Sequence, residues 1–324
     1  MCTAITLNLN RRYCGRTLDL DRGLGEGIVV CPRNYEMTFT HQPTQAHGYA
    51  IAGIGTVRAG FPLFYDAVNE KGLWMAGLSF PHFARYEIAE KGKLNLASYE
   101  LIPFVLRECA SIGEAADKLA QASVSADAFS AEFPPTPLHW ILCGNDGCIV
   151  IESTEHGTQI FNDPIGVLTN APGFEYHIQN LSNYLSLSPE PPTVRLGKES
   201  YVRAFSNGMG AIGLPGDSSS VSRFIRAAYA KFNSYIPEEE GLCIRQFFHV
   251  LSSVKQIKGN VKLEGGGLEY TVYTCCCDTE NLVYYYTLYE SSRIRAFDIK
   301  KENLDSHELS EYPMITDKQI EIQN

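Results

Sequence analysis

The chain has 324 residues, 44% of them hydrophobic and 20% charged, which is the balance of a folded protein with a sizeable core. Its formal net charge of −10 excludes the broad basic face that a nucleic acid requires, so no nucleic-acid partner is expected. The sequence contains no run of about 18 apolar residues, which argues against stable insertion in a membrane.

Cysteine usage and the start of the chain bear on location and cofactors. The apolar residues at the start precede Arg11 and Arg12 instead of following them, unlike an export signal, so a cytoplasmic location is expected, with most of the 10 thiols as small buried groups. Two patterns invite a metal-site interpretation: the run Cys275 to Cys277, and Cys143 with Cys148. Neighbouring strand residues face opposite sides, however, and the second pattern lacks the second pair typical of zinc sites. We expect no metal and no other cofactor.

Apolar alternation predicts that the first half of the chain is rich in strands, over residues 2–9, 13–20, 27–31, 36–40, 49–55 and 72–79. If the break at 10–12 lets the first two strands pair, Cys2 comes to lie beside the segment from Arg16 to Asp19. Apolar residues at spacings of three and four then predict helices over 98–109 and 112–122, with Pro103 as a candidate kink.

The second half repeats this alternation of strands and helices. Strands are predicted at 138–143 and 148–153, on either side of a turn at 144–147, and a short strand leads into residues 169–172. Helices are predicted over 173–187, 222–235 and 241–254, followed by strands at 268–278, 282–289 and 293–297 and a polar tail. Strands that alternate with helix pairs indicate helices packed on sheets, in one domain over residues 1–324.

A cysteine directly after the initiator methionine has a chemical consequence. Removal of Met1 would leave a thiol and a free α-amine on Cys2, with reference pKa values of about 8.5 and about 7.7–8.0. The amine is then partly neutral near pH 7 and able to take the thiol proton, so nucleophile and base share one residue. Taken alone, Cys2 is better explained as a small residue at the start of a strand.

Other polar residues strengthen the catalytic interpretation. Arg16 would favour a thiolate, and Asp19 would orient the α-amine, although a surface ion pair is the simpler reading. Asn170 precedes a proline at the end of a short strand, where it suits either an oxyanion donor or a turn. Arg223 lies in the first turn of a predicted helix, which is an unfavourable place for a cation and hints at a role.

These segments, in this order, resemble the choloylglycine hydrolase family, which contains bile salt hydrolases and penicillin V acylases. The resemblance covers most of the chain and rests on MCT, GRTLD, CPRNY, NEKGL, GLSFP, PLHW, IGVLTNAP, GLPGD with SRFIR, FFHVLSSV, EYTVYTCC and KENLD. It implies an α+β fold, the four-layer αββα sandwich of N-terminal nucleophile hydrolases, often assembled as a homotetramer. It also implies hydrolysis of a linear amide, with glycine- or taurine-conjugated bile salts as substrates. An amine that takes the place of water in the last step would yield a new amide, so acyl transfer is chemically accessible as well.

The resemblance also implies residue roles. Cys2 corresponds to the nucleophile, Arg16 and Asp19 to the pair that tunes and orients it, Asn170 to the oxyanion donor and Arg223 to the active-site arginine.

One position departs from the family pattern. Bile salt hydrolases usually have an asparagine where this chain has Ser79, whose backbone N–H would have to serve the oxyanion. Penicillin V acylases commonly have an aromatic residue there, so Ser79 matches neither group. The apolar substrate pocket corresponds to Leu18, Phe129, Phe133 and Leu138; the two phenylalanines fit equally well as core residues under a loop.

Three alternatives remain at this stage. Penicillin V or an N-acyl homoserine lactone would be cleaved by the same machinery. A papain-like enzyme would use His139 with a cysteine, but no papain-type cysteine context is present and a lone strand histidine is more often a core residue. The third, a metal-binding or structural protein, rests only on the cysteine patterns.

Overall fold

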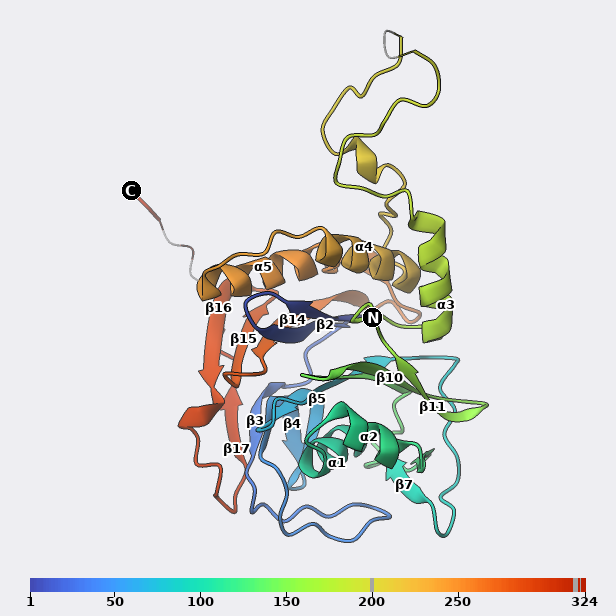
Figure 1. Ribbon diagram of the computed structural model, residues 1–324. Coiled ribbons are helices and arrows are strands. Elements are labelled where there is room, and N and C mark those ends of the chain that lie inside the picture. The colour runs from blue at the N-terminus through green and yellow to red at the C-terminus, as the bar shows by residue number, and fades with distance from the viewer. Residues whose placement is uncertain (199–200, 317–319, 321) are drawn as a thin grey trace.

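Two β-sheets stack face to face, and a pair of helices covers the outer face of each, so that the computed structural model has four layers in the order αββα (Figure 1). The structure describes residues 1–198, 201–316, 320 and 322–324. The expected α+β sandwich is therefore confirmed. None of the helices in these ranges is both long enough and apolar enough to cross a bilayer.

The first sheet contains the start of the chain at its centre. In spatial order its strands are β12 (Val167–Leu168), β1 (Cys2–Asn8), β2 (Arg12–Leu20), β14 (Leu268–Asp278), β15 (Val283–Leu288) and β16 (Ser291–Asp298), with β13 (Val261–Lys262) paired to β14. All these pairings are antiparallel.

The second sheet is also antiparallel and faces the first across the core. Its strands, in spatial order, are β11 (Gly157–Asn162), β10 (Gly147–Thr154), β9 (Leu138–Gly144), β6 (Trp74–Ser79), β5 (Phe61–Asn69), β4 (Ile51–Arg58), β3 (Gly27–Cys31) and β17 (Ser310–Pro313). A separate parallel pair is formed by β7 (Leu94–Ala97) and β8 (Ala122–Ser125).

The two helix pairs have amphipathic sequences that pack one face on a sheet, and two of the four helices begin at a serine N-cap. Helices α1 (Leu101–Glu108) and α2 (Ile112–Leu119) cover the second sheet, while α4 (Ser220–Phe232) and α5 (Glu240–Ser252) cover the first. The hydroxyls of Ser111 and Ser219 accept the backbone N–H groups of Glu114 and Ser222, capping α2 and α4. Helix α3 (Phe174–Asn180) and the short 3-10 segments at Leu181–Tyr184, Met209–Ala211 and Ile299–Lys301 complete the set.

A buried carboxylate lies inside the core between the two sheets. Asp66, on β5, accepts hydrogen bonds from the hydroxyls of Tyr273 at 2.6 Å and Tyr284 at 2.9 Å, both from the opposite sheet. Burial raises the pKa of Asp66, although Arg16 and the two tyrosines oppose that shift. These hydrogen bonds hold the two sheets in a fixed position relative to each other near Arg16.

Several parts of the sequence-based prediction were wrong or incomplete. The strand predicted at 36–40 is absent, and only an isolated bridge joins Met37 to Gln45. Strand β5 was missed, although it carries Asp66. The expected polar tail includes β17, and its residues 317–319 and 321 lie outside the described ranges. Pro103 causes no kink, because α1 begins later than predicted and its first turn needs no N–H there.

The connection between α3 and α4 projects from the sandwich as a long arm (Figure 1). Within the described parts of residues 185–212, this arm exposes large apolar side chains: Leu185 at 84%, Leu196 at 87%, Tyr201 at 86%, Phe205 at 86% and Ile212 at 68%. Side chains of this type are normally buried, so the arm is a surface suited to a partner.

Candidate active site

Cys2 lies at the first position of β1, where the strand pairing places it directly opposite Leu18. Ala4 is opposite Arg16 in the same register. Because alternate residues share a face, Cys2, Arg16 and Leu18 all point to the same side of the sheet. The predicted position of Cys2 beside the Arg16–Asp19 segment is confirmed.

Met1 is still attached in this structure and continues the pairing by one residue. Its α-amine donates to the carbonyl of Asp19 at 3.0 Å, and the Asp19 N–H donates to the Met1 carbonyl at 3.0 Å. The amine also forms an ion pair with the buried carboxylate of Glu269. Burial lowers the pKa of this amine, an effect that Cys2 and Asp19 oppose.

Asn170 is brought to Cys2 by the short strand β12. Ala4 and Ile5 are the partners of Leu168 and Val167, and continuing this register carries Asn170 to the end of β1. The Asn170 Oδ1 accepts the Cys2 N–H at 2.9 Å, and its Nδ2 donates to the Ser79 carbonyl at 2.7 Å. The side-chain amide of Asn170 is therefore fixed in orientation beside Cys2.

The backbone of Ser79 faces the same place. The Phe80 N–H donates to Pro137 at 2.8 Å, so Ser79 and its partner Leu138 form a non-hydrogen-bonded pair. The N–H and C=O of Ser79 then point away from β9, on the side where its carbonyl contacts Asn170. This geometry supports the expectation that the Ser79 N–H and the Asn170 side-chain amide lie next to each other, as two donors for one oxyanion would.

Arg223 projects from the start of α4 into the same cluster. Its Nη2 donates to Asn170 Oδ1 at 2.6 Å, and its Nη1 donates to the Cys2 carbonyl at 2.5 Å and the Thr3 hydroxyl at 2.7 Å. The guanidinium is fully buried, and burial lowers its pKa while Asp19 and Cys2 oppose the shift. Arg223 thus holds Asn170 and the β1 terminus together.

Asp19 and Arg16 are also fully buried, so they are not a surface ion pair. Asp19 accepts from the hydroxyls of Thr271 at 2.7 Å and Thr17 at 3.2 Å. Burial raises the pKa of Asp19, and Arg223 and the α-amine are the main opposing charges. Asp19 is three positions after Arg16 on β2, so its carboxylate lies on the opposite face of the strand from the Cys2 thiol.

Arg16 donates to the carbonyls of Gly77 at 2.5 Å and Tyr65 at 3.1 Å. Its Nη2 is buried and has no hydrogen-bond partner in the described part of the chain. Burial by itself lowers the pKa of Arg16, but Cys2 and Tyr273 more than offset that effect and raise it. Arg16 therefore places a buried positive charge on the wall of the cavity that Cys2 also lines.

A cavity of about 250 Å³ opens from Cys2 between the two sheets. Cys2, Arg16, Ser79 and all four residues expected in the substrate pocket line it. Phe129 and Phe133 are half-buried on its wall and contact each other edge to face, so they are not core residues. The wall also includes residues that the sequence did not indicate: Leu20, Leu24, Thr56, Leu63, Phe64, Tyr65, Gly77, Ser98, Tyr99, Ile102, Pro134, Thr136 and Trp140.

Comparison with known proteins agrees with this geometry. The model of the linear amide C–N hydrolases, choloylglycine hydrolase family, matches residues 2–312. A bile salt hydrolase/transferase of Lactiplantibacillus plantarum is 41% identical over 319 residues, covering 98% of each chain. This chain belongs to the choloylglycine hydrolase family.

Solved structures place this choloylglycine hydrolase family member in the same fold. The C2A mutant of the conjugated bile acid hydrolase from Clostridium perfringens matches with a TM-score of 0.92 over 100% of both chains, at 33% identity. Penicillin V acylase from Agrobacterium tumefaciens matches with a TM-score of 0.75, covering 96% of this chain and 90% of its own, at 18% identity. The second likeness shows the shared fold alone.

His139 belongs to a buried hydrogen-bond network in this family member. Its Nδ1 lies 3.1 Å from Glu152 Oε1 and its Nε2 lies 3.1 Å from the Thr169 carbonyl, so both ring nitrogens are engaged within a buried network. His177 Nε2 lies 2.9 Å from the Asn170 carbonyl, and Glu152 also accepts the Phe174 N–H at 2.9 Å. The network holds the segment that carries Asn170, and nothing in it favours a papain-like pair.

The pH dependence of stability provides a test of this network. Burial lowers the pKa of His177 to about 4, whereas an unfolded chain has a value of about 6.5. The unfolded state therefore takes up a proton first, and the wild type is expected to lose about 3 kcal/mol as pH falls from about 6.5 to about 4.

The matched variant is His177→Gln, which keeps a donor for the Asn170 carbonyl and cannot titrate. Urea unfolding of both proteins across this range gives the difference in free energy of unfolding. Asp163, whose pKa burial raises to about 6, acts in the opposite direction but is common to both proteins. A difference that does not change with pH would show that His177 is not held neutral.

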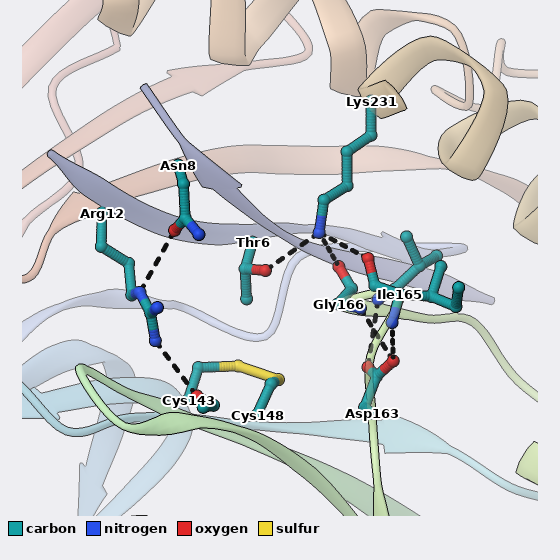
Figure 2. The surroundings of a disulfide bond; sticks show 11 residues. Thr6, Asn8, Arg12, Cys143, Cys148, Asp163, Ile165, Gly166 and Lys231 are labelled. Atoms are coloured by element: carbon teal, nitrogen blue, oxygen red, sulfur yellow. Dashed lines mark hydrogen bonds between the residues drawn. A yellow bond between two sulfur atoms is a disulfide. The ribbon is translucent and has the colours of Figure 1, made fainter. Parts of the chain in front are cut away.

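The segment before β12 is anchored by the side chains of Asp163 and Lys231 (Figure 2). Asp163 accepts the N–H groups of Ile165, Gly166 and Val167 at 2.7–3.1 Å, and Lys231 donates to the Gly166 carbonyl at 3.3 Å and the Thr6 hydroxyl at 3.1 Å. These contacts fix the strand that brings Asn170 to Cys2.

The two cysteine patterns noted in the sequence form a disulfide and a run of buried thiols. Cys143 and Cys148 are opposite each other on β9 and β10 and form a disulfide (Figure 2). Cys275, Cys276 and Cys277 are all buried within β14. Within the described residues, no group of three or more His, Cys, Asp or Glu side chains is arranged to hold a metal ion.

Proposed function

We propose that this protein hydrolyses the amide bond of glycine- or taurine-conjugated bile salts, with Cys2 as the nucleophile after removal of Met1. The observation that carries the proposal is the apolar cavity that reaches Cys2, whose backbone N–H is bonded to the Asn170 side chain. A rigid steroid buried against its aromatic and aliphatic wall contributes about 25 cal/mol per Å² of apolar surface. The amide at the end of the side chain then reaches the thiol.

The proposed reaction proceeds through an acyl-enzyme. The Cys2 thiolate attacks the amide carbonyl, and the Asn170 amide with the Ser79 N–H stabilises the oxyanion. The α-ammonium of Cys2, balanced by Asp19, gives a proton to the departing nitrogen. Water then hydrolyses the thioester and releases the free acid.

Parallel assays of the purified protein test this proposal. Intact mass spectrometry is expected to show the loss of Met1, and glycocholate and taurocholate are expected to be cleaved at least about tenfold faster than penicillin V or an N-acyl homoserine lactone. Preferred cleavage of either rival substrate would replace the bile-salt assignment while leaving the mechanism in place. No cleavage of any of these amides would refute both.

We also propose that the protein is a cytoplasmic homo-oligomer, a tetramer, assembled through the arm between α3 and α4. The exposed apolar side chains of the arm support a second copy of the chain as its partner. Replacing Tyr201 and Phe205 together by Asp is expected to reduce the molar mass measured by light scattering. Ile88→Asp, at an equally exposed position elsewhere, serves as the control and should leave the mass unchanged.

A further inference from the structure

The second sheet has an opening between two of its strands. Strands β5 and β6 pair only over residues 66–68 and 74–76. At the next residues, the carbonyls of Tyr65 and Gly77 both accept from Arg16 Nη1, at 3.1 and 2.5 Å, in place of a partner on the neighbouring strand. We call this opening, between Tyr65 and Gly77, the β5–β6 seam.

The cavity that begins at Cys2 crosses the second sheet at this seam. Cys2 and Leu18 belong to the core that contains the first sheet, whereas Phe64 and Trp140 belong to the core that packs against α1 and α2. All four line the same cavity, and so do the two residues of the seam. A ligand in this cavity therefore contacts Cys2 on one side of the second sheet and Trp140 on the other.

Two buried donors on the cavity wall have no partner. Among the residues that the structure describes, the buried side-chain atoms without a hydrogen bond include two from this wall, Arg16 Nη2 and Trp140 Nε1. Both side chains are fully buried. A guanidinium and an indole N–H can only donate, so the group that is missing is an acceptor. A buried donor left unpaired is costly, which favours a ligand that brings an oxygen to this wall.

The free indole N–H lies at the seam. A Cβ added to Gly77 would lie 3.2 Å from Trp140 Nε1 and 3.3 Å from its Cδ1, so this edge of the indole faces Gly77. Gly77 also provides the carbonyl that Arg16 holds, so the two free donors lie beside the same residue. Trp74 differs, because its Nε1 donates to the Tyr284 hydroxyl at 2.9 Å. The Trp140 N–H is therefore available to a ligand.

We propose that Trp140 Nε1 donates a hydrogen bond to an oxygen on the acyl half of the substrate, a ring hydroxyl of the steroid. The neighbouring wall includes Leu63, Phe64 and Leu138, so the acceptor must be carried on an apolar body, and a hydroxylated steroid has this composition. Because Trp140 lies across the second sheet from Cys2, it contacts the ring system while the amide reaches the thiol. This inference rests on the proposed function and makes Trp140 a specificity-determining residue.

A pair of substrates tests the proposal. Glycocholate and the glycine conjugate of cholanic acid share the steroid skeleton and the amide, and they differ only in the ring hydroxyls. The ratio of their kcat/KM values, measured below the concentrations at which they form micelles, isolates the contribution of the hydroxyls. Trp140→Phe is expected to lower this ratio about fivefold, because one neutral hydrogen bond is lost from the hydroxylated substrate alone.

Trp74→Phe is the matched control, since Trp74 is equally buried and lies outside the cavity wall. Its ratio should equal that of the wild type. A Trp140→Phe variant with an unchanged ratio, the result expected if ordered water were the partner of the indole, would overturn this inference and leave bile-salt hydrolysis standing. A wild type that cleaves neither conjugate refutes the proposed function itself.

A second measurement applies even if Trp140→Phe fails to fold. The chain has only two tryptophans, so isotope labelling of their nitrogens gives two indole N–H signals in an NMR spectrum. In Cys2→Ala, which binds substrate without turnover, glycocholate is expected to move one signal downfield, as a new hydrogen bond does, whereas the cholanic acid conjugate is not. Tyr284→Phe, which removes the partner of Trp74, identifies the other signal. Equal shifts with the two conjugates, or no shift at saturating glycocholate, would contradict the proposal.

Discussion

Replacing Cys2 by Ala is expected to abolish amide hydrolysis, with kcat falling by at least about 10⁴-fold. The sulfur is the only protein atom in the proposed reaction that forms a covalent bond with the acyl carbon, so no neighbouring side chain can replace it. The side chain is small and lies at the end of β1, so the free energy of unfolding should change little. Steady-state assays with glycocholate and thermal unfolding of both proteins measure the two effects.

The remaining thiols provide the control for this prediction. Burial raises the pKa of Cys109 to about 11 and that of Cys14 to about 12, so both remain protonated and unreactive near neutral pH. Iodoacetamide is therefore expected to inactivate the wild type by modifying Cys2, and Cys109→Ala should keep full activity. Substantial hydrolysis by Cys2→Ala would show that another residue is the nucleophile.

Replacing Asn170 by Ala is expected to lower kcat by about 10²–10³-fold with a much smaller change in KM. The amide is fixed by Cys2, Arg223 and Ser79, so its loss removes the proposed oxyanion donor and also leaves Arg223 without one acceptor. The measurement is the pair of kinetic constants for glycocholate.

The control is Asn183→Ala, because Asn183 is exposed beyond α3 and lies outside the cavity wall. It should match the wild type in both constants. If Asn170→Ala raised KM and left kcat unchanged, Asn170 would be a substrate-binding group and another donor would have to stabilise the oxyanion.

Local sequence patterns were sufficient to predict most of the strands of the first sheet. Alternation over residues 2–9 and 13–20, with one break between them, predicts a hairpin, and the hairpin alone places Cys2 beside Leu18. The two helix pairs were predicted for a similar reason, since each has an apolar face with helical spacing. The candidate catalytic residues lie on or next to these strongly patterned segments.

Contacts between distant segments could not be predicted in this way. Glu269 meets the start of the chain only because β14 lies beside β2, and nothing in the residues around Glu269 indicates that partner. Strand β5 has a proline and several aromatic residues in place of clear alternation, so Tyr65 and Asp66 were missed. His177 was unassigned because its role depends on the fold of the Asn170 segment.

The hydrogen bonds that Met1 makes with Asp19 have a practical consequence for preparing the enzyme. A chain that keeps its first residue pairs Met1 with Asp19 and Glu269, so we expect unprocessed protein to fold and to purify together with processed protein. Specific activity then measures the fraction of trimmed chains in a batch. An affinity tag belongs at the C-terminal end of the polypeptide, since an N-terminal fusion would block the Cys2 α-amine, which is the base in the proposed reaction.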